Sequence, residues 1–368
     1  MSCRCVCEPV QVRRVELTNV RNVRRAVLAL GPGLNVLVGG NAQGKTSVLE
    51  AMGLAARGLS FRSDDAAAVV SAGASEMNAT AILSPGGPEL AFSFGDRGRR
   101  FSMNGRAVRP GEYRGTMEVV VHWAQRLRLI RGSMRERREY LDRTLAAHRP
   151  THARAVRDYG RVIEQRNALL GSGRKGLDAW DERLIAEGAR VRVGRAGFVR
   201  EINARLGRWR GPAGEAFEIG LQSDSEDDGA QRADIERSLE QSRHRERQAG
   251  RTLVGPHRDG VLLRAGGRDV SESASSGQAR MLLLSLALAT QEIYRDARRS
   301  AVVGLLDDVD AELEIDRARE VCGQAARVGQ VVVTTARTDW LNRMDVPHSV
   351  FTVQEGRVSE AEVRAGAV

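Results

Sequence analysis

The sequence predicts an α/β fold in which a sheet of buried strands is interrupted by a long helical insertion. A glycine-spaced loop, residues 39–46, lies between a predicted strand and a predicted helix. An acidic pair, Asp307-Asp308, follows a second strongly apolar strand. Between these two features, residues 123–250 have the apolar spacing of helices. The chain must therefore leave the sheet and return to it, which predicts a sheet domain in two segments and a helical domain between them.

The first residues show no strand pattern. Cys3, Cys5 and Cys7 alternate with other residues, and no His or Cys partner follows at zinc spacing, so residues 1–9 are predicted to be a disordered extension. Four cysteines in 368 residues do not make a disulfide framework. The chain has neither the apolar core of a signal peptide nor a run of membrane-spanning length, so a soluble protein is expected. The few cysteines indicate a reducing cytoplasm as its setting.

Residues 10–122 are expected to form the first segment of the sheet domain. Asn104-Gly105 is typical of a tight turn between strands. A helix is expected directly after the glycine-spaced loop, from Thr46 to Met52. The predicted strands cover residues 10–17, 26–30, 34–38, 79–83, 90–94 and 100–103.

The loop has the Gly, four residues, Gly-Lys-Thr spacing that cradles nucleotide phosphates with backbone N–H groups at a helix N-terminus. Lys45 is one of only two lysines among 57 Lys and Arg residues, and the other, Lys175, lies in a Gly/Ser-rich stretch. A compact ammonium fits between the β- and γ-phosphates where a planar guanidinium does not. We therefore predict ATP or GTP binding, with a catalytic role for Lys45. The predicted nucleotide contacts are Gly39, Gly40, Asn41, Ala42, Gln43, Gly44, Lys45, Thr46 and Ser47.

The helical region, residues 123–250, is rich in Arg, Glu, Ala and Leu. Heptads are not sustained along it, so a compact helical arm is expected and not a long coiled coil. The predicted helices cover residues 134–147, 151–170, 177–209 and 230–249.

Residues 251–368 are expected to complete the sheet domain, with buried strands at 302–306 and 330–335. A phosphate-binding loop needs a carboxylate at the end of a neighbouring strand to hold Mg²⁺. We assign that role to Asp307 together with the Thr46 hydroxyl. Asp308 is predicted to be catalytic, because it is placed to polarise the attacking water.

Ser276, Gly277 and Gln278 open an amphipathic helix that reaches Arg295. This sequence lies about 30 residues before the acidic pair. In that position it resembles the signature loop of ABC-type ATPases. In that superfamily the loop contacts the γ-phosphate held by a second subunit. The resemblance implies a head-to-tail homodimer that encloses two nucleotides, and it places Gln125 near the position of a catalytic, γ-phosphate-sensing glutamine.

Further motifs occur in matching order along the chain, and together they resemble the RecF family of bacterial recombination mediators. The resemblance implies the fold of a P-loop ABC-type ATPase head with a helical arm inserted as a second domain. It also implies ATP-dependent binding of duplex and gapped DNA in replication and recombinational repair, slow DNA-stimulated ATP hydrolysis, and action with RecR and RecO in loading RecA. The motifs are Leu17–Asn22, Ser60–Arg62, Leu129–Gly132, Arg137–Asp142, Gln165–Leu170 and Gly255–Asp259.

The net charge of +10 and the isoelectric point near 10.3 agree with a nucleic-acid partner. An ABC transporter subunit would lack the helical insertion, and a structural SMC protein would need long heptads. Departures from the family pattern, such as Gly40 in place of an acidic residue and Met134 in place of a proline, leave one alternative open. The chain would then be a divergent RecF-like paralogue that serves as an ATP-switched DNA sensor in defence or regulation.

Overall fold

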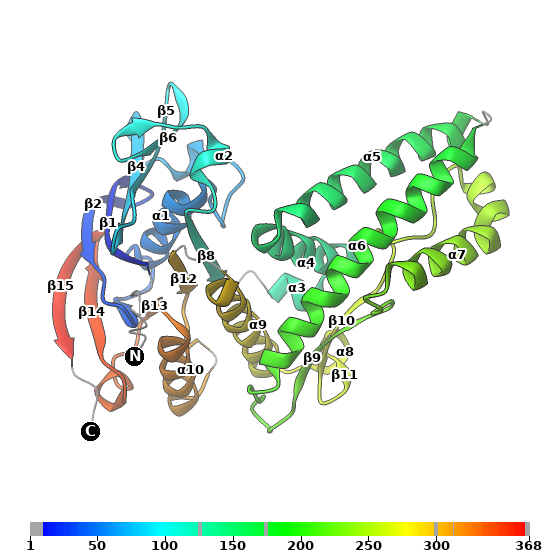
Figure 1. Cartoon of the computed structure of the whole chain (residues 1–368). Coiled ribbons are helices and arrows are strands. Elements are labelled where there is room, and N and C mark those ends of the chain that lie inside the picture. Colours follow the sequence, from blue (N-terminus) through cyan, green and yellow to red (C-terminus); the bar gives the residue numbers. More distant parts are fainter. Residues whose placement is uncertain (1–9, 124–126, 173–175, 298–300, 312, 365–368) are drawn as a thin grey trace, which may run out of the picture. The chain divides into compact units, whose positions relative to one another are not determined.

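The computed structural model describes residues 10–123, 127–172, 176–297, 301–311 and 313–364. They form two compact units (Figure 1). The first unit combines the residues up to Ala124 with those from Ala287 onward, and the second runs from Gln125 to Leu286. The extension predicted at residues 1–9, with its three cysteines, and the predicted catalytic Gln125 lie outside the described residues.

The first unit contains an antiparallel sheet whose strands alternate between buried and exposed residues, as expected when one face packs on a core. Its order is β2-β1-β4-β5-β6-β7. The strands are β1 (Gln11–Val20), β2 (Val23–Ala29), β4 (Glu76–Ser84), β5 (Glu89–Gly95), β6 (Gly98–Met103) and β7 (Arg106–Ala107).

The second sheet of this unit has the order β15-β14-β3-β13-β12-β8, and its strands from β14 to β8 are parallel. Every residue of β8, β12 and β13 is buried, which explains why apolar residues predominate in all three strands. The parallel arrangement brings the carboxyl ends of β3, β13 and β12 to one edge. The strands are β3 (Leu34–Val38), β8 (Met117–His122), β12 (Ala301–Leu306), β13 (Val331–Thr335), β14 (His348–Gln354) and β15 (Arg357–Arg364).

Helix α1 (Lys45–Arg57) contacts strands of both sheets and is almost entirely buried, so it forms the centre of the core of the first unit (Figure 1). Helix α10 (Ile315–Val328) packs on β3 and β13. Gln330 joins the two sheets, because its side-chain amide donates to the carbonyl of Val12 at 2.7 Å and its oxygen accepts from the Val12 N–H at 2.9 Å. The shorter helical segments of this unit are α2 (Pro110–Tyr113), η1 (Ala67–Val69) and η3 (Leu341–Arg343).

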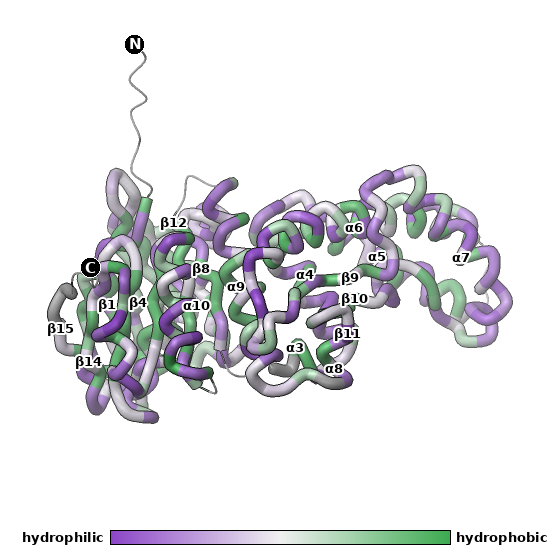
Figure 2. Tube along the Cα trace, turned by 90° about the horizontal axis from the view of Figure 1, so that it is seen from below, coloured by the Kyte–Doolittle hydropathy of each residue, from purple (hydrophilic) through white to green (hydrophobic). Residues whose placement is uncertain are grey.

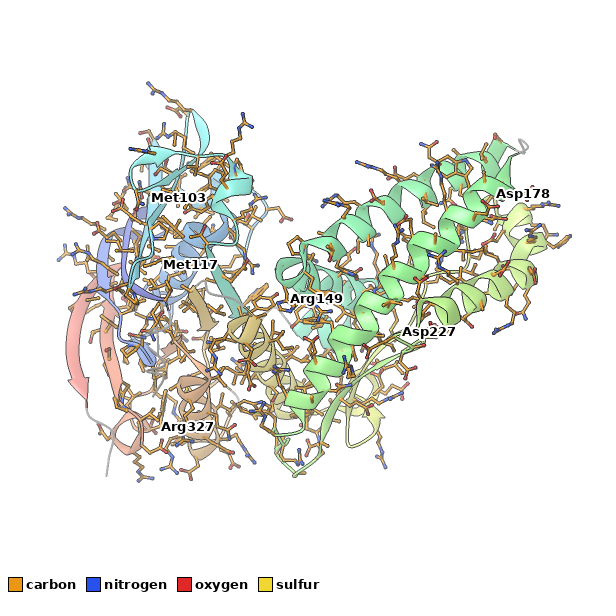
Figure 3. The ribbon with its side chains drawn as sticks, viewed as in Figure 1. Met103, Met117, Arg149, Asp178, Asp227 and Arg327 are labelled. Carbon is orange, nitrogen blue, oxygen red and sulfur yellow. The ribbon has the colours of Figure 1, made fainter. Side chains whose placement is uncertain are left out.

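The second unit is built on long helices. In one of them, α7, hydrophilic residues predominate (Figure 2). Asp227 is the N-cap of α7, and its side chain accepts a hydrogen bond from Gly229 N at 3.0 Å (Figure 3). The helices are α3 (Leu127–Arg131), α4 (Met134–His148), α5 (Pro150–Ser172), α6 (Leu177–Leu206), α7 (Asp228–Ala249), α8 (Val270–Ser273) and the part of α9 (Ser276–Ala297) that precedes Ala287.

The second unit extends beyond the arm boundary that the sequence predicts at residue 250. A three-stranded sheet, β11-β10-β9, packs with its helices, since β9 (Phe217–Leu221) contacts α6 and β10 (Val261–Ala265) contacts α4. The partner strand β11 (Arg268–Asp269) and the first turns of α9 follow in the same unit. The pairing of β10 with β9 attaches the residues after 250 to the helical region, and the unit ends at Leu286. Within the described residues, no helix is long and apolar enough to cross a membrane.

Candidate functional site

The glycine-spaced loop connects β3 to α1, as the sequence predicts. Gly44 is the N-cap of α1 and has a φ of 113°, in the left-handed region that favours glycine. Ala42 is also left-handed, with a φ of 61°. A β-carbon at Gly39 would lie 2.2 Å from the carbonyl oxygen of Val353. The loop therefore takes a tight course that brings backbone N–H groups to the N-terminus of α1.

The Lys45 ammonium lies across this loop. Its Nζ donates hydrogen bonds to the carbonyl oxygens of Gly39, at 2.8 Å, and Gly40, at 2.9 Å. The lysine is only 5 % exposed, so its charge stays close to the loop. A phosphate cradled by the loop would lie within reach of this ammonium.

Asp307 follows β12 and faces α1. Both of its carboxylate oxygens accept from the Thr46 hydroxyl, at 2.9 and 3.0 Å, and Oδ1 also accepts from the Thr334 hydroxyl at 2.8 Å. Burial raises the pKa of Asp307 above its usual value and the charge of Asp308 adds to the rise, while the two hydroxyls oppose it. A buried carboxylate in this position is stabilised as the anion by a nearby cation. Oxygen atoms of a hydroxyl and a carboxylate are ligands that suit Mg²⁺.

Asp308 has a different environment from its neighbour. Its φ of 46° is left-handed, and its backbone N–H donates to the Thr334 hydroxyl at 2.7 Å. Asp308 also lines a pocket of about 440 Å³ that lies over the loop. The two adjacent acids therefore occupy different places, one beside Thr46 and one on the pocket wall. The pocket is lined by Arg21, Asn22, Asn41, Ala42, Gln43, Gly44, Lys45, Thr46, Ser47, Arg62 and Asp308.

Arg21 and Arg62 line this pocket although the sequence indicates no role for them. Arg21 lies in the motif Leu17–Asn22 and Arg62 in the motif Ser60–Arg62. Membership of these two motifs is the one sequence feature that marks the two arginines as functional candidates. The Glu50 carboxylate, which is fully buried on α1, holds Arg21 through two hydrogen bonds of 2.9 and 3.0 Å. It also accepts from Arg62 at 3.5 Å and from the Ser60 hydroxyl at 2.5 Å. One buried carboxylate thus positions two cations at the pocket.

The predicted signature loop lies in the second unit, where Ser276 begins α9. The Ser275 hydroxyl accepts from Gln278 N at 3.2 Å, and the Gln278 side-chain oxygen accepts from Ser275 N at 2.9 Å. This reciprocal pair is a capping box that orders the start of the helix. The Gln278 side chain is engaged locally, whereas Ser276 is exposed.

Motifs in the second unit form buried ion pairs. Arg166 donates to Asp181 at 2.7 Å and to Glu246 at 2.6 Å, which connects α5, α6 and α7. Arg192 holds Asp259 with two hydrogen bonds of 2.7 and 2.8 Å. These residues stabilise the packing of the helices, a role that sequence spacing does not reveal.

The phosphate-binding loop follows the parallel strand β3, and Asp307 follows the parallel strand β12. Together they define the class of protein: an ABC-type ATPase head with a helical unit inserted. Residues 11–359 match the family model described as RecF/RecN/SMC N terminal domain. The chain belongs to the RecF family, as its sequence relatives show.

One such relative is the "DNA replication and repair protein RecF" of Clavibacter sepedonicus, which is 32% identical over 396 residues, covering 97% of this chain and 94% of that protein. The protein of the same description from Arthrobacter sp. strain FB24 is 33% identical, covering 96% and 100%. These matches span the sheet segments and the helical insertion alike.

Solved structures show the same fold. The structure described as recombination mediator protein RecF-ATP in the RecFOR pathway aligns with a TM-score of 0.80 at 24% identity, covering 98% of this chain and 100% of that chain. The Smc head domain of Pyrococcus furiosus aligns with a TM-score of 0.60 at 15% identity, covering 96% of each chain. The predicted fold class is confirmed.

Proposed function

We propose that this protein is an ATP-dependent DNA-binding protein of replication and recombinational repair, and that ATP closes two copies into a head-to-tail dimer on DNA. The observation that carries the proposal is the convergence of Lys45, Thr46 and Asp307 at the end of a phosphate-binding loop. The family relatives, described as DNA replication and repair proteins, support the biological setting. The protein would act in the cytoplasm.

The loop residues fit a nucleoside triphosphate with Mg²⁺. Backbone N–H groups at the start of α1 would bind the phosphates, and the Lys45 ammonium would leave the loop carbonyls for the β- and γ-phosphates. Thr46 and Asp307 would hold Mg²⁺, because they present adjacent oxygen atoms. When bound, Mg²⁺ neutralises the charge that develops on the phosphates. Arg21 and Arg62 add positive charge at the pocket.

Asp308 would orient and polarise the water that attacks the γ-phosphate, since it lines the pocket and its backbone is held by Thr334. Asp307, in contrast, is hydrogen-bonded to Thr46 at the proposed metal-binding position. Gln125 is proposed as a second residue near that water. Slow, DNA-stimulated turnover would suit a switch whose bound state persists.

The dimer would be completed by Ser276, Gly277 and Gln278 from the second copy, which would approach the γ-phosphate. The capping box at Ser275 and Gln278 supports this role, because it orders a helix N-terminus whose dipole favours an anion. Reopening after hydrolysis would release DNA. RecR- and RecO-type mediators are proposed as partners in loading RecA at gapped junctions.

Contact with DNA would come from arginines that are not neutralised by neighbouring acids. Residues 97–114 contain six arginines and one glutamate, a net charge of +5 within a chain of +10. Arg99, Arg106 and Arg109 are exposed, and none of them forms an ion pair with the part of the chain that the structure describes. Side chains with nitrogen tips surround this end of the first unit, above Met103 (Figure 3). Such arginines bind phosphates without reading sequence.

A second candidate is a divergent paralogue that senses DNA in a defence or regulatory system, favoured by departures such as Gly40 in the loop. Binding to gapped and to fully duplex DNA, measured with and without ATP and purified RecR, separates the two. A repair mediator should prefer the gap and respond to RecR.

The two lysines of the chain allow a matched test of the ATP site. Lys45→Met should weaken ATP binding by a factor of about 100 and should abolish ATP-dependent dimerisation, because it removes a charged phosphate contact. Lys175→Met removes the same charge outside the loop and should bind and dimerise as the wild type does. ATP affinity and mass in solution, with and without Mg-ATP, are the measurements. A Lys45→Met protein that dimerises normally with ATP would refute the site.

A further inference from the structure

The turn between β14 and β15 lies directly against the phosphate-binding loop. Glu355 N donates to the Gln43 side-chain oxygen at 2.6 Å, and Gly356 N donates to the Gln43 carbonyl oxygen at 2.9 Å. Both turn residues are left-handed, with φ values of 50° and 73°. Gln43 is thus bound through its side chain and its backbone by one turn from the far end of the chain.

The backbones of the turn and of the loop region are in close contact. A β-carbon at Gly356 would lie 2.1 Å from the carbonyl oxygen of Asn22, and one at Gly39 would lie 2.2 Å from that of Val353. Contacts this short cannot be relieved by rotation of a side chain, because both involve backbone oxygens. Glycine is therefore required at both positions.

Asn22, in the turn between β1 and β2, holds the loop from another side. Its Nδ2 donates to the carbonyl of Ala42 at 3.1 Å, and its Oδ1 accepts from the Ser47 hydroxyl at 2.9 Å. Asn22 and Gln43 together link three segments that are remote in sequence. The loop is held by these two turns as well as by its own strand and helix.

The hairpin formed by β14 and β15 also holds β3, the strand that leads into the phosphate-binding loop. β14 pairs in parallel with β3 from His348–Leu34 to Thr352–Val38. Loss of the Gln43 side chain would leave this ladder intact, so the tip of the loop can be loosened while the sheet stays paired.

We propose that Gln43 and the Glu355-Gly356 turn are positioning residues, which hold the loop in its phosphate-binding conformation before the nucleotide arrives. This inference rests on the proposed ATP-binding function. A glycine-containing loop that is free in solution must lose conformational entropy when it closes on phosphate. The hairpin turn reduces that cost, because it orders the loop in advance. Gln43, which the sequence suggests only as a nucleotide contact, acts here chiefly through the turn.

The test compares Gln43→Ala and Gly356→Ala with Gly73→Ala in the full-length protein. Gly73 has a φ of 76°, close to that of Gly356, but no atom beyond its two chain neighbours lies within 4 Å of a β-carbon placed there. Gly73→Ala therefore reproduces the backbone strain without the contact with Asn22. ATP affinity, the KM and kcat of ATP hydrolysis, and the melting temperature are measured for each variant.

Gln43→Ala and Gly356→Ala should each lose about tenfold in ATP affinity, the order expected for one or two lost hydrogen bonds. KM should rise while kcat at saturating ATP stays near the wild-type value, because the loop reaches the same conformation once ATP is bound. The double variant should lose less than the product of the single losses, since both act through one interaction. Gly73→Ala should keep wild-type ATP affinity.

Wild-type ATP affinity in Gln43→Ala would overturn the inference, and so would a loss of affinity in Gly73→Ala equal to that in Gly356→Ala. If Gly356→Ala fails to fold, Gln43→Ala decides the result, because it removes only a side-chain bond. Failure of the wild-type protein to bind ATP would instead refute the proposed function itself.

Discussion

At the scale of single residues, the site depends on a threonine that holds two adjacent acids. The Thr334 hydroxyl donates to Asp307 Oδ1 at 2.8 Å and accepts from Asp308 N at 2.7 Å. It therefore fixes the proposed metal ligand and the backbone of the proposed catalytic acid at the same time. A short polar side chain on the neighbouring strand thus orients both acids.

Thr334→Val keeps the shape of the side chain and removes both hydrogen bonds. The Mg²⁺ concentration that gives half-maximal ATP hydrolysis should rise by about tenfold or more, because the buried Asp307 carboxylate loses a supporting donor. Thr80→Val is the control, since Thr80 is half-buried on β4 and, among the residues described, its hydroxyl donates only to the Asn78 side-chain oxygen. An Mg²⁺ titration of Thr334→Val that overlays that of the wild type would contradict this role.

At the scale of elements, the helices of the second unit are joined by ion pairs that are largely removed from water. Burial alone would raise the pKa of Asp142, but hydrogen bonds from Arg195 and His152 outweigh it and lower that pKa to about 2. Breaking one partner of such a buried pair costs about 3–5 kcal/mol. The family motifs found here by sequence are thus explained by packing of the helices.

We expect His257 to make the stability of this unit depend on pH. Burial lowers the pKa of His257 from 6.5 to about 4, and its Nδ1 accepts from the Tyr159 hydroxyl at 2.7 Å while Nε2 donates to the Thr252 carbonyl. Between these pH values the unfolded chain binds a proton that the folded chain does not. Stability should therefore fall as the pH decreases from 6.5 to 4, by on the order of 3 kcal/mol.

His257→Gln should remove this dependence, so that its free energy of unfolding changes less between pH 6.5 and pH 4 than that of the wild type. Denaturant unfolding at four pH values in this interval is the measurement. His244→Gln, at an exposed position of α7, should retain the wild-type slope. Equal slopes for His257→Gln and the wild type would show that this imidazole is not the group responsible.

At the scale of the whole molecule, the distribution of charge matters more than its sum. Many arginines are neutralised, as Arg135 and Arg143 are by Glu139 and Arg161 is by Asp158. The exposed arginines of residues 97–114 that lack such partners concentrate positive charge on one part of the first unit. A polyanion gains most from charges that no acid already neutralises.

The triple variant of Arg99, Arg106 and Arg109 to alanine should bind duplex DNA more weakly at low salt. Its plot of log affinity against log salt should be less steep by about 2–3, since each phosphate contact contributes about 0.9 to the slope. The triple variant of Arg135, Arg143 and Arg161 to alanine has the same net charge and should keep a nearly wild-type slope. Equal effects in the two triple variants would mean that net charge alone governs binding.

A feature of this protein can be predicted from the sequence most readily when its residues are close together along the chain. The loop residues, Lys45 and the helix after them are contiguous, and their spacing alone predicts their arrangement. Asp307 is remote, but a carboxylate after an apolar strand is a local pattern too, and parallel pairing of strands brings it to the same edge as the loop. The sequence predicts that the helical arm ends at residue 250, whereas the second compact unit continues to Leu286, with β10 paired to a strand inside the helical region.

The sequence by itself determined the class of protein, the phosphate-binding loop and the acids that follow β12, because each is a short pattern of neighbouring residues. Only the tertiary structure decided which remote side chains support them: Glu50 behind Arg21, Thr334 between the two acids, and the β14–β15 turn on Gln43. These contacts join segments far apart in the chain. Which side chains meet in these contacts depends on the order of the strands in the sheet and on the backbone angles. No local pattern of residues encodes either of these.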